Sequence, residues 1–167
     1  MKTAFLGSSN PHGNTRYFAE VCCRVCNAEI VDISTYDFTP WDYDGKNLND
    51  EFQHLAKLML EYSDIIFCTP VYWYSMSCQM KIFFDRFSDL LTRRKRIGKA
   101  LAGKRTWLIA VGNEAVIPEG FEVPFKRTSD YMKMHYMGAV FGDSTNDEFS
   151  PVDIKKAESF GHRIKMA

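Results

Sequence analysis

Hydrophobic residues along the chain fall into two alternating patterns, which predict strands and helices in turn. Short continuous apolar runs predict buried strands, and they occupy residues 2–6, 29–33, 64–68, 106–111 and 135–141. Longer segments with apolar residues three and four positions apart predict helices, and they occupy residues 18–26, 52–62, 76–91, 121–134 and 151–165. Strands that alternate with helices of this length predict a parallel sheet with right-handed crossovers, and therefore a doubly wound α/β domain.

Polar segments separate these elements, and none of them has the composition of an interdomain linker. Thr69-Pro70 is expected to end the third strand, and Gly112-Asn113 the fourth. The 167 residues are 46% hydrophobic, which is enough to bury a full core without disulfides or a metal. We therefore predict a single domain over residues 1–167.

The charges of the chain are balanced, with 21 Lys and Arg against 21 Asp and Glu. A net charge of zero gives no overall attraction to nucleic acid or to an anionic membrane, so we expect neither as a partner. The apolar runs are far shorter than the roughly 20 residues that span a bilayer. The chain also begins without an apolar signal region, so we expect no membrane insertion and a cytoplasmic location.

Five cysteines are present, and their placement argues against a disulfide framework. Cys22, Cys23 and Cys26 lie in one predicted helix, and Cys68 lies in a predicted strand. Cys23 and Cys26 form a Cys-x-x-Cys within the helix, but no second pair follows at zinc spacing. We interpret them as small apolar helix residues and predict no metal site.

In open parallel sheets, ligands bind beyond the carboxyl ends of the strands, which directs attention to the loops after the first, third and fourth strands. The first loop, residues 7–15, is rich in hydroxyl, amide and glycine residues and leads into a helix, so its backbone N–H groups suit a phosphate. Alternatively, Asn14 or Thr15 only caps the helix. The loop has neither a Gly-Lys-Ser/Thr ending nor a Gly-x-Gly-x-x-Gly pattern, which disfavours nucleoside triphosphates and a Rossmann NAD site.

The second loop places three adjacent aromatic residues, Tyr72, Trp73 and Tyr74, at the tip of a strand. Exposed aromatic rings are unfavourable unless something covers them. A planar heteroaromatic ligand would do so, and so would a neighbouring subunit. Both interpretations hold together if the ligand lies at a subunit interface.

A family resemblance rests on Gly7-Ser8, Gly13-Asn14-Thr15 and above all the continuous segment 69–86, Thr-Pro-Val-Tyr-Trp-Tyr-Ser-Met-Ser-Cys-Gln-Met-Lys-Ile-Phe-Phe-Asp-Arg. These residues, in this order, resemble the NADPH-dependent FMN reductase-like branch of the flavodoxin-like superfamily. The resemblance implies a flavodoxin-like three-layer sandwich, in which a five-stranded parallel sheet of order 2-1-3-4-5 has helices on both faces.

The resemblance also implies an FMN site made by three loops. The residues implied for the phosphate are Ser8, Asn10, Gly13, Asn14 and Thr15. Those implied along the isoalloxazine ring are Pro70, Val71, Tyr72, Trp73 and Ser75, and the third loop closes the site with Gly112, Asn113 and Glu114. Members of the family usually form dimers or tetramers, which implies a homodimer or homotetramer here.

The reaction implied is a hydride transfer from NAD(P)H through bound FMN to a planar small-molecule acceptor, such as a quinone, a nitro or azo compound, or free flavin. It requires no acid–base side chain, so no catalytic residue is assigned. The alternative is a flavodoxin-type electron carrier without NAD(P)H turnover of its own. Such carriers are strongly acidic, and the zero net charge disfavours one. A flavin-free scaffold with the same fold also remains open.

Several features depart from the family pattern. Where many relatives have a cation in the first loop, this chain has Ser8-Ser9-Asn10, which predicts weakened FMN binding unless Arg16 or His12 compensates. Residues 36–50 contain no cysteine, so no iron–sulfur cluster is expected. Residues 93–105 carry seven Lys and Arg, which we interpret as a solvated loop or, alternatively, as a contact for the extra phosphate of NADPH or for an acidic redox partner.

Overall fold

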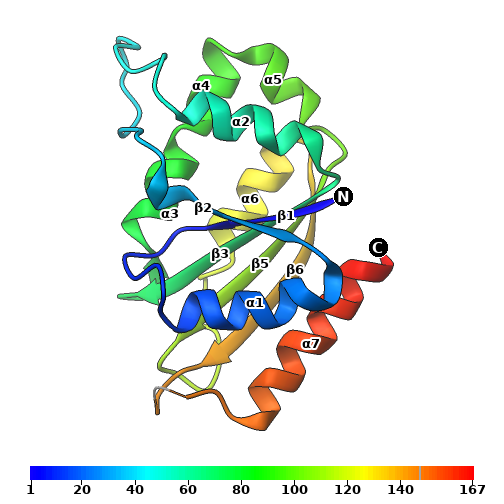
Figure 1. The fold of residues 1–167 in the computed structure, drawn as a ribbon. Coiled ribbons are helices and arrows are strands. Elements are labelled where there is room, and N and C mark those ends of the chain that lie inside the picture. The colour runs from blue at the N-terminus through cyan, green and yellow to red at the C-terminus, as the bar shows by residue number, and fades with distance from the viewer. Residues whose placement is uncertain (147) are drawn as a thin grey trace.

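The computed structural model describes residues 1–146 and 148–167, and within them five parallel strands form the central sheet (Figure 1). The strands are β1 (Lys2–Leu6), β2 (Glu29–Asp32), β3 (Asp64–Tyr72), β5 (Arg105–Gly112) and β6 (His135–Asp143). Their spatial order is β2-β1-β3-β5-β6. Counted among the parallel strands alone, this is the predicted order 2-1-3-4-5.

Helices cover both faces of the sheet, so the fold is the predicted three-layer sandwich (Figure 1). One face packs against α1 (Asn14–Cys26) and α7 (Pro151–Met166), which lie side by side. The helices that cover the other face or flank its core are α2 (Phe52–Glu61), α3 (Cys78–Asp85), α4 (Phe87–Thr92), α5 (Lys95–Ala100) and α6 (Val123–Tyr131). Successive side chains of β1 and β3 enter opposite cores, because neighbouring residues of a strand point to opposite faces.

The structure corrects two predicted boundaries. The third strand does not end at Thr69-Pro70 but continues to Tyr72, because it turns back into a short antiparallel strand, β4 (Ser75–Met76). The helix predicted over 76–91 therefore begins only after β4, and it is divided at Arg86 into α3 and α4. Apolar spacing alone did not distinguish the hairpin from a helical turn.

Two short helical segments were not predicted. The 3₁₀ turn η1 (Ile33–Thr35) follows β2, and the Asp32 side chain caps it by accepting a hydrogen bond from the N–H of Ser34. The helix α5 lies within the basic stretch 93–105, so this stretch is not simply a loop.

Four cysteines pack in the core, as predicted: Cys22, Cys23 and Cys26 of α1 lie against Cys68 of β3, and all four thiols are free. Cys26 is the last residue of its helix rather than an interior one. Among the described residues, no group of three or more His, Cys, Asp and Glu is arranged to hold a metal ion. None of the helices described is both long enough and apolar enough to cross a membrane.

An ion pair joins the amino-terminal ends of β3 and β5. The buried Asp64 accepts hydrogen bonds from Arg105 Nε at 2.7 Å and Nη2 at 2.8 Å, and from Trp107 Nε1 at 3.0 Å. Burial by itself would raise the pKa of Asp64, but the hydrogen bonds from Arg105, Trp107 and Ser63 outweigh it and hold the pKa below its ordinary value.

We expect Asp64→Asn to lower the free energy of unfolding at pH 7 by about 2–3 kcal/mol, since it leaves Arg105 without its carboxylate. A carboxyl whose pKa is lowered by folding contributes its full stability above the unfolded-state pKa of about 4 and loses it as the pH falls through the folded-state value. Urea unfolding at pH 7 and pH 3 should therefore show that the difference in free energy of unfolding between wild type and variant is smaller at pH 3. A gap independent of pH would show that Asp64 acts only through packing.

Candidate functional site

A pocket of about 680 Å³ opens at the carboxyl ends of the central strands, where an open parallel sheet holds its ligand. Loops that follow different strands all contribute to its wall. The residues that line it are Ser8, Asn10, Gly13, Asn14, Thr15, Pro70, Val71, Tyr72, Trp73, Tyr74, Val111, Asn113, Glu114, Pro118, Phe141 and Ser144. The three loops singled out by the sequence therefore face one common space.

At one end of the pocket, the first loop leads into α1 with its backbone N–H groups uncapped. Gly13 is the N-cap residue, and no side chain accepts a hydrogen bond from the first turn. The interpretation that Asn14 or Thr15 caps this helix is therefore wrong. Asn10 Oδ1 instead accepts from the backbone N–H of His12 at 3.1 Å, within the loop. Free N–H groups at the positive end of a helix dipole make this end of the pocket suitable for a phosphate.

The missing loop cation is not replaced by Arg16. Its Nη2 lies 2.9 Å from Asp32 Oδ2 and its Nε donates to the carbonyl of Pro11, which directs the guanidinium to the end of β2. His12 is exposed and is not among the lining residues. This end of the pocket is thus built from backbone amides, hydroxyls and side-chain amides.

At the other end of the pocket, the aromatic residues form the tip of the β3–β4 hairpin. Trp73 and Tyr74 have φ angles of 48° and 63°, the left-handed pair that a two-residue type I′ turn requires. The hairpin is closed by pairing of Tyr72 with Ser75 and of Val71 with Met76. This turn leaves Trp73 94% exposed and Tyr74 66% exposed. The tip therefore presents aromatic surface that nothing within the described chain covers.

A buried serine fixes the two loops relative to each other. Ser77 Oγ donates to the carbonyl of Gly7 at 2.7 Å and accepts from the N–H of Met80 at 3.1 Å, as the N-cap of α3. The N–H of Ser77 donates to Thr69 Oγ1 at 3.0 Å. The end of β1, the strand β3 and the start of α3 are thus joined at one residue. Sequence reasoning assigned Ser77 no role, although it lies in the motif segment.

The third loop is held by the end of β6. The N–H of Ser144 donates to the carbonyl of Gly112 at 2.8 Å, and Ser144 Oγ donates to Asn113 Oδ1 at 2.9 Å. Asn113 and Glu114 line the pocket. Among the described lining residues, Glu114 is the one Asp, Glu, Lys, Arg or His residue. The end of the pocket near this loop therefore carries one negative charge and no positive one.

Two predicted site residues do not line the pocket. Gly112 is buried, and a Cβ there would lie 3.1 Å from Val71 and 3.2 Å from Phe141, so it is a packing position. Met76 of β4 enters the core, and Ser75, as its neighbour in the strand, therefore points to the opposite side. The remaining eleven predicted residues all line the pocket.

Lining residues that the prediction did not include are Tyr74, Val111, Pro118, Phe141 and Ser144. Tyr74 belongs to the aromatic tip. Phe141 and Ser144 come from the carboxyl end of β6, the last parallel strand. The rule that ligands lie beyond the carboxyl ends of strands would have indicated this fourth loop too, had it been applied to every strand.

Comparisons with known proteins agree with this geometry. The family model of NADPH-dependent FMN reductase matches residues 2–143. YwqN of Bacillus subtilis (strain 168), described as an NAD(P)H-dependent FMN-containing oxidoreductase, is 28% identical over 154 residues, which cover 86% of this chain and 85% of YwqN.

Solved structures show the same fold. The Trp repressor binding protein from Bacillus subtilis is 24% identical with a TM-score of 0.71, covering 99% of this chain and 97% of that one. An FMN-dependent NADH-azoreductase from Bacillus anthracis, solved in complex with FMN, is 10% identical with a TM-score of 0.64, covering 99% of this chain and all (100%) of that one. The match of the family model over most of the chain, together with a pocket built from the motif residues, leads to one conclusion: the chain belongs to the NADPH-dependent FMN reductase family, whose members are oxidoreductases that use FMN and NAD(P)H.

Proposed function

We propose that this chain is an FMN-dependent oxidoreductase that passes a hydride from NAD(P)H to a planar acceptor, such as a quinone, a nitro or azo compound, or free flavin. The observation that carries the proposal is the single pocket of about 680 Å³ that joins the uncapped start of α1 to the aromatic hairpin. A phosphate-binding end and an aromatic end in one pocket match the two ends of FMN. The unit that binds it is the whole chain, residues 1–167, as one domain.

The residues present fit this cofactor. The N–H groups of the first turn of α1, with Ser8, Asn14 and Thr15, would hold the phosphate dianion. A Cβ on Gly13 would lie 2.9 Å from Asn10 Nδ2, so the loop fits closely around a residue without a side chain. Backbone groups of this kind bind a dianion without a cation, although more weakly than with one.

The β3–β4 hairpin would hold the ring. Pro70 and Val71 line the pocket wall, while Tyr72 and Trp73 stand at its mouth. When bound, FMN supplies the redox chemistry, accepting a hydride from the nicotinamide and passing it on. The protein orients the ring and leaves one face open for the nicotinamide and then for the acceptor. No lining residue is assigned a proton-transfer role.

We also propose that the protein works as a homodimer or homotetramer in the cytoplasm. The exposed rings of Trp73 and Tyr74 support an oligomer, because such an aromatic tip is stabilised when a flat acceptor or a second subunit covers it. A subunit boundary at the hairpin would place both the acceptor and the second subunit next to the cofactor.

The test is an FMN titration of the purified protein, followed by anaerobic mixing with NADPH or NADH. We expect flavin absorbance to develop on titration and to bleach after addition of the nicotinamide. Bleaching by dithionite alone would support the electron-carrier alternative. Failure to bind FMN at all would leave only the fold.

Replacing Trp73 with Ala is expected to lower kcat/KM for a quinone acceptor by about tenfold, because a stacked aromatic contact contributes about 1 kcal/mol or more. Steady-state kinetics with menadione and a nitroaromatic compound would measure it. Tyr131→Ala is the matched control, since Tyr131 is 72% exposed and does not line the pocket. Equal effects of the two substitutions would contradict the assignment of the hairpin to acceptor binding.

A further inference from the structure

The seven cations of residues 93–105 lie at the end of the molecule opposite the pocket (Figure 1). Arg105 begins β5, and Val111 near its other end lines the pocket. An eight-residue strand is about 25 Å long, so Arg105 lies far from the pocket mouth. This separation favours another explanation for the cations than the extra phosphate of NADPH.

Some of these cations already have structural partners. Lys104 Nζ donates to the carbonyls of Leu60 and Tyr62, and Arg105 pairs with Asp64. The others with partners bind backbone carbonyls of the loop before α2: Arg93 with Asp42 and Tyr43, and Arg94 with Leu48. These four side chains stabilise the fold, and binding a ligand would require them to give up these contacts.

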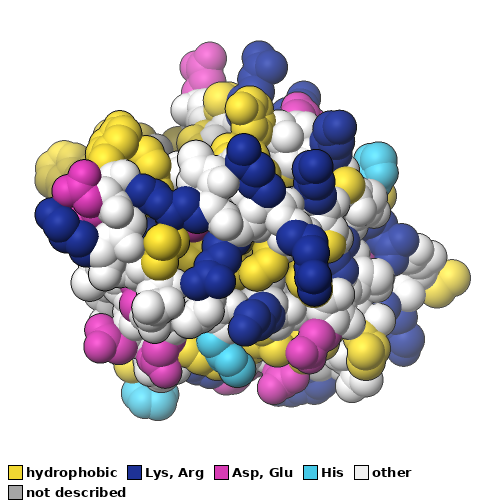
Figure 2. Space-filling view, turned by 90° about the horizontal axis from the view of Figure 1, so that it is seen from above, with side chains coloured by type: hydrophobic (Ala, Val, Ile, Leu, Met, Phe, Trp, Pro, Cys, Tyr) yellow, Lys and Arg dark blue, Asp and Glu magenta, His cyan; other side chains and the backbone are white. Residues whose placement is uncertain are grey.

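Four other cations are exposed and form no hydrogen bond or ion pair with any residue that the structure describes: Lys95, Arg96 and Lys99 on α5, and Lys57 on α2. No Asp or Glu occurs anywhere between Asp89 and Glu114 to neutralise them. Figure 2 looks onto this end of the molecule and shows Lys and Arg side chains gathered around small apolar areas. The zero net charge of the chain thus conceals a strongly positive end.

Between α2 and α5 this end is hollowed into a groove of about 620 Å³, the α2–α5 groove. Lys57 stands on one side, and Lys95 and Arg96 on the other. Leu60 and Ile97, both half-buried, supply apolar surface between them. The groove therefore combines cationic rims with an apolar lining.

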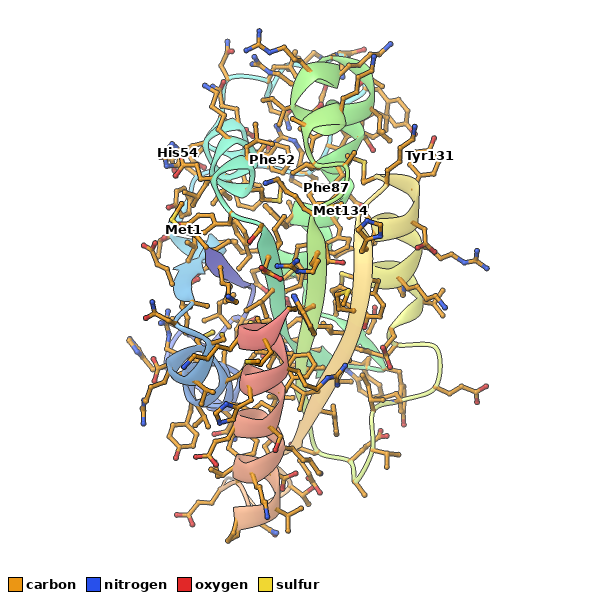
Figure 3. The ribbon with its side chains drawn as sticks, turned by 90° about the vertical axis from the view of Figure 1, so that its right-hand side faces the viewer. Met1, Phe52, His54, Phe87, Tyr131 and Met134 are labelled. Atoms are coloured by element: carbon orange, nitrogen blue, oxygen red, sulfur yellow. The ribbon has the colours of Figure 1, made fainter. Side chains whose placement is uncertain are left out.

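Close packing holds the α5 wall of the groove in place. A Cβ on Gly98 would lie 2.3 Å from the carbonyl oxygen of Leu90, so α5 sits directly on the backbone of α4. Beneath these helices, Phe52 of α2 and Phe87 of α4 belong to one core cluster, and both are labelled inside this end of the molecule in Figure 3. A preformed groove loses little conformational entropy when it binds.

We propose that the α2–α5 groove docks an acidic amphipathic segment of a partner protein, with Asp and Glu along its flanks and apolar side chains at its centre. The unneutralised cations select an anion. The apolar lining from Leu60 and Ile97 favours a peptide with aliphatic side chains over a nucleic acid, whose backbone presents mainly charged phosphates and polar sugar oxygens. The concave shape favours a narrow segment over a flat bilayer surface.

A second copy of this chain does not suit the groove. In a twofold dimer, the same surface meets itself, and here cations would face cations. The groove also lies far from the pocket, so a segment docked in it leaves the pocket mouth open. A partner docked in the groove would therefore hold this protein without covering its pocket.

The test selects short random peptides displayed on phage against the full chain, and measures the enriched peptides by fluorescence anisotropy. We expect enriched sequences to combine Asp or Glu with Leu, Ile or Phe, and their affinity to fall as salt rises. The double variant Lys95→Glu/Arg96→Glu, on the α5 wall, should weaken binding by at least about tenfold, and Lys57→Glu, on the opposite wall, should also weaken it. Lys126→Glu, which matches the charge change of Lys57→Glu at an exposed position outside the groove, should leave binding within about twofold.

Circular dichroism checks that each variant retains the fold. Because the readout is peptide binding, the result does not depend on FMN binding. The proposal is overturned if enriched peptides lack the acidic and apolar combination, or if binding survives charge reversal on both walls. It is also overturned if duplex DNA, RNA or phosphatidylglycerol vesicles bind the same surface more tightly than the peptides at equal salt, which would assign the positive end to another class of polyanion.

Discussion

Replacing Asn14 with Asp is expected to weaken FMN binding by about 100-fold, or about 2.7 kcal/mol, while leaving riboflavin binding nearly unchanged. Asn14 is the first residue of α1 and lines the phosphate end of the pocket. The new carboxylate would face the phosphate dianion without a cation to balance it, since Arg16 is engaged with Asp32. Riboflavin has the same ring but no phosphate, so it reports on the ring site alone.

The variant should fold at least as well as the wild type, because a carboxylate in the first turn of a helix interacts favourably with the helix dipole. The expected measurements are fluorescence titrations with FMN and with riboflavin, together with thermal unfolding. Equal losses of affinity for the two ligands would show that the phosphate does not lie at α1, and the orientation of the cofactor proposed above would be wrong.

The second large effect concerns stability. Arg86→Met is expected to lower the free energy of unfolding by about 3–5 kcal/mol, because it removes the cation that hydrogen-bonds to the buried carboxylate of Asp89 and the half-buried one of Asp50. Arg86 is 1% exposed, and its Nε donates to Asp89 Oδ2 at 2.8 Å and its Nη2 to Asp50 Oδ1 at 3.0 Å. It also donates to the backbone carbonyls of Thr39 and Asn47, and so holds the long loop before α2 against α4.

Lys81→Met in the preceding helix is the matched control. Lys81 pairs with Asp85 on the surface, where such an ion pair contributes about 0.5 kcal/mol or less. Urea unfolding compares the two variants, and limited proteolysis follows the loop over residues 37–50. The assignment of Arg86 as the anchor of this loop fails if both variants lose equally little stability, or if the loop is cleaved no faster in Arg86→Met.

Lys81, Asp85 and Arg86 lie four and five residues apart, a spacing that is typical of helix-surface contacts. Spacing of four residues correctly describes Lys81 and Asp85, whose pairing is local. Arg86 differs because its partners Asp50, Thr39 and Asn47 lie 36, 47 and 39 residues away along the chain. Separations of that length leave no periodic trace in a sequence, so only folded coordinates reveal the buried arginine.

The same distinction holds at the site. The apolar runs fixed which segments are strands, and the strand order placed the carboxyl ends of β1 and β3 beside each other, which brought the Ser8 and Trp73 loops to one pocket. The hydroxyl of Ser77 that joins these loops carries no such signal, since an isolated serine has no periodicity.

Local patterns of hydrophobicity determined which segments are strands and helices, and hence the doubly wound α/β class. The resemblance carried by the motif residues implied the strand order and thirteen site residues, of which eleven line the pocket. Only the tertiary structure decided which charged groups have partners: Arg16 pairs with Asp32 and turns away from the first loop, and Arg105 pairs with Asp64, whereas Lys95 and Arg96 have no partner among the residues described. The physical reason is that burial of apolar residues follows from each segment's own pattern, whereas the neutralisation of a charge depends on residues that folding brings from elsewhere in the chain.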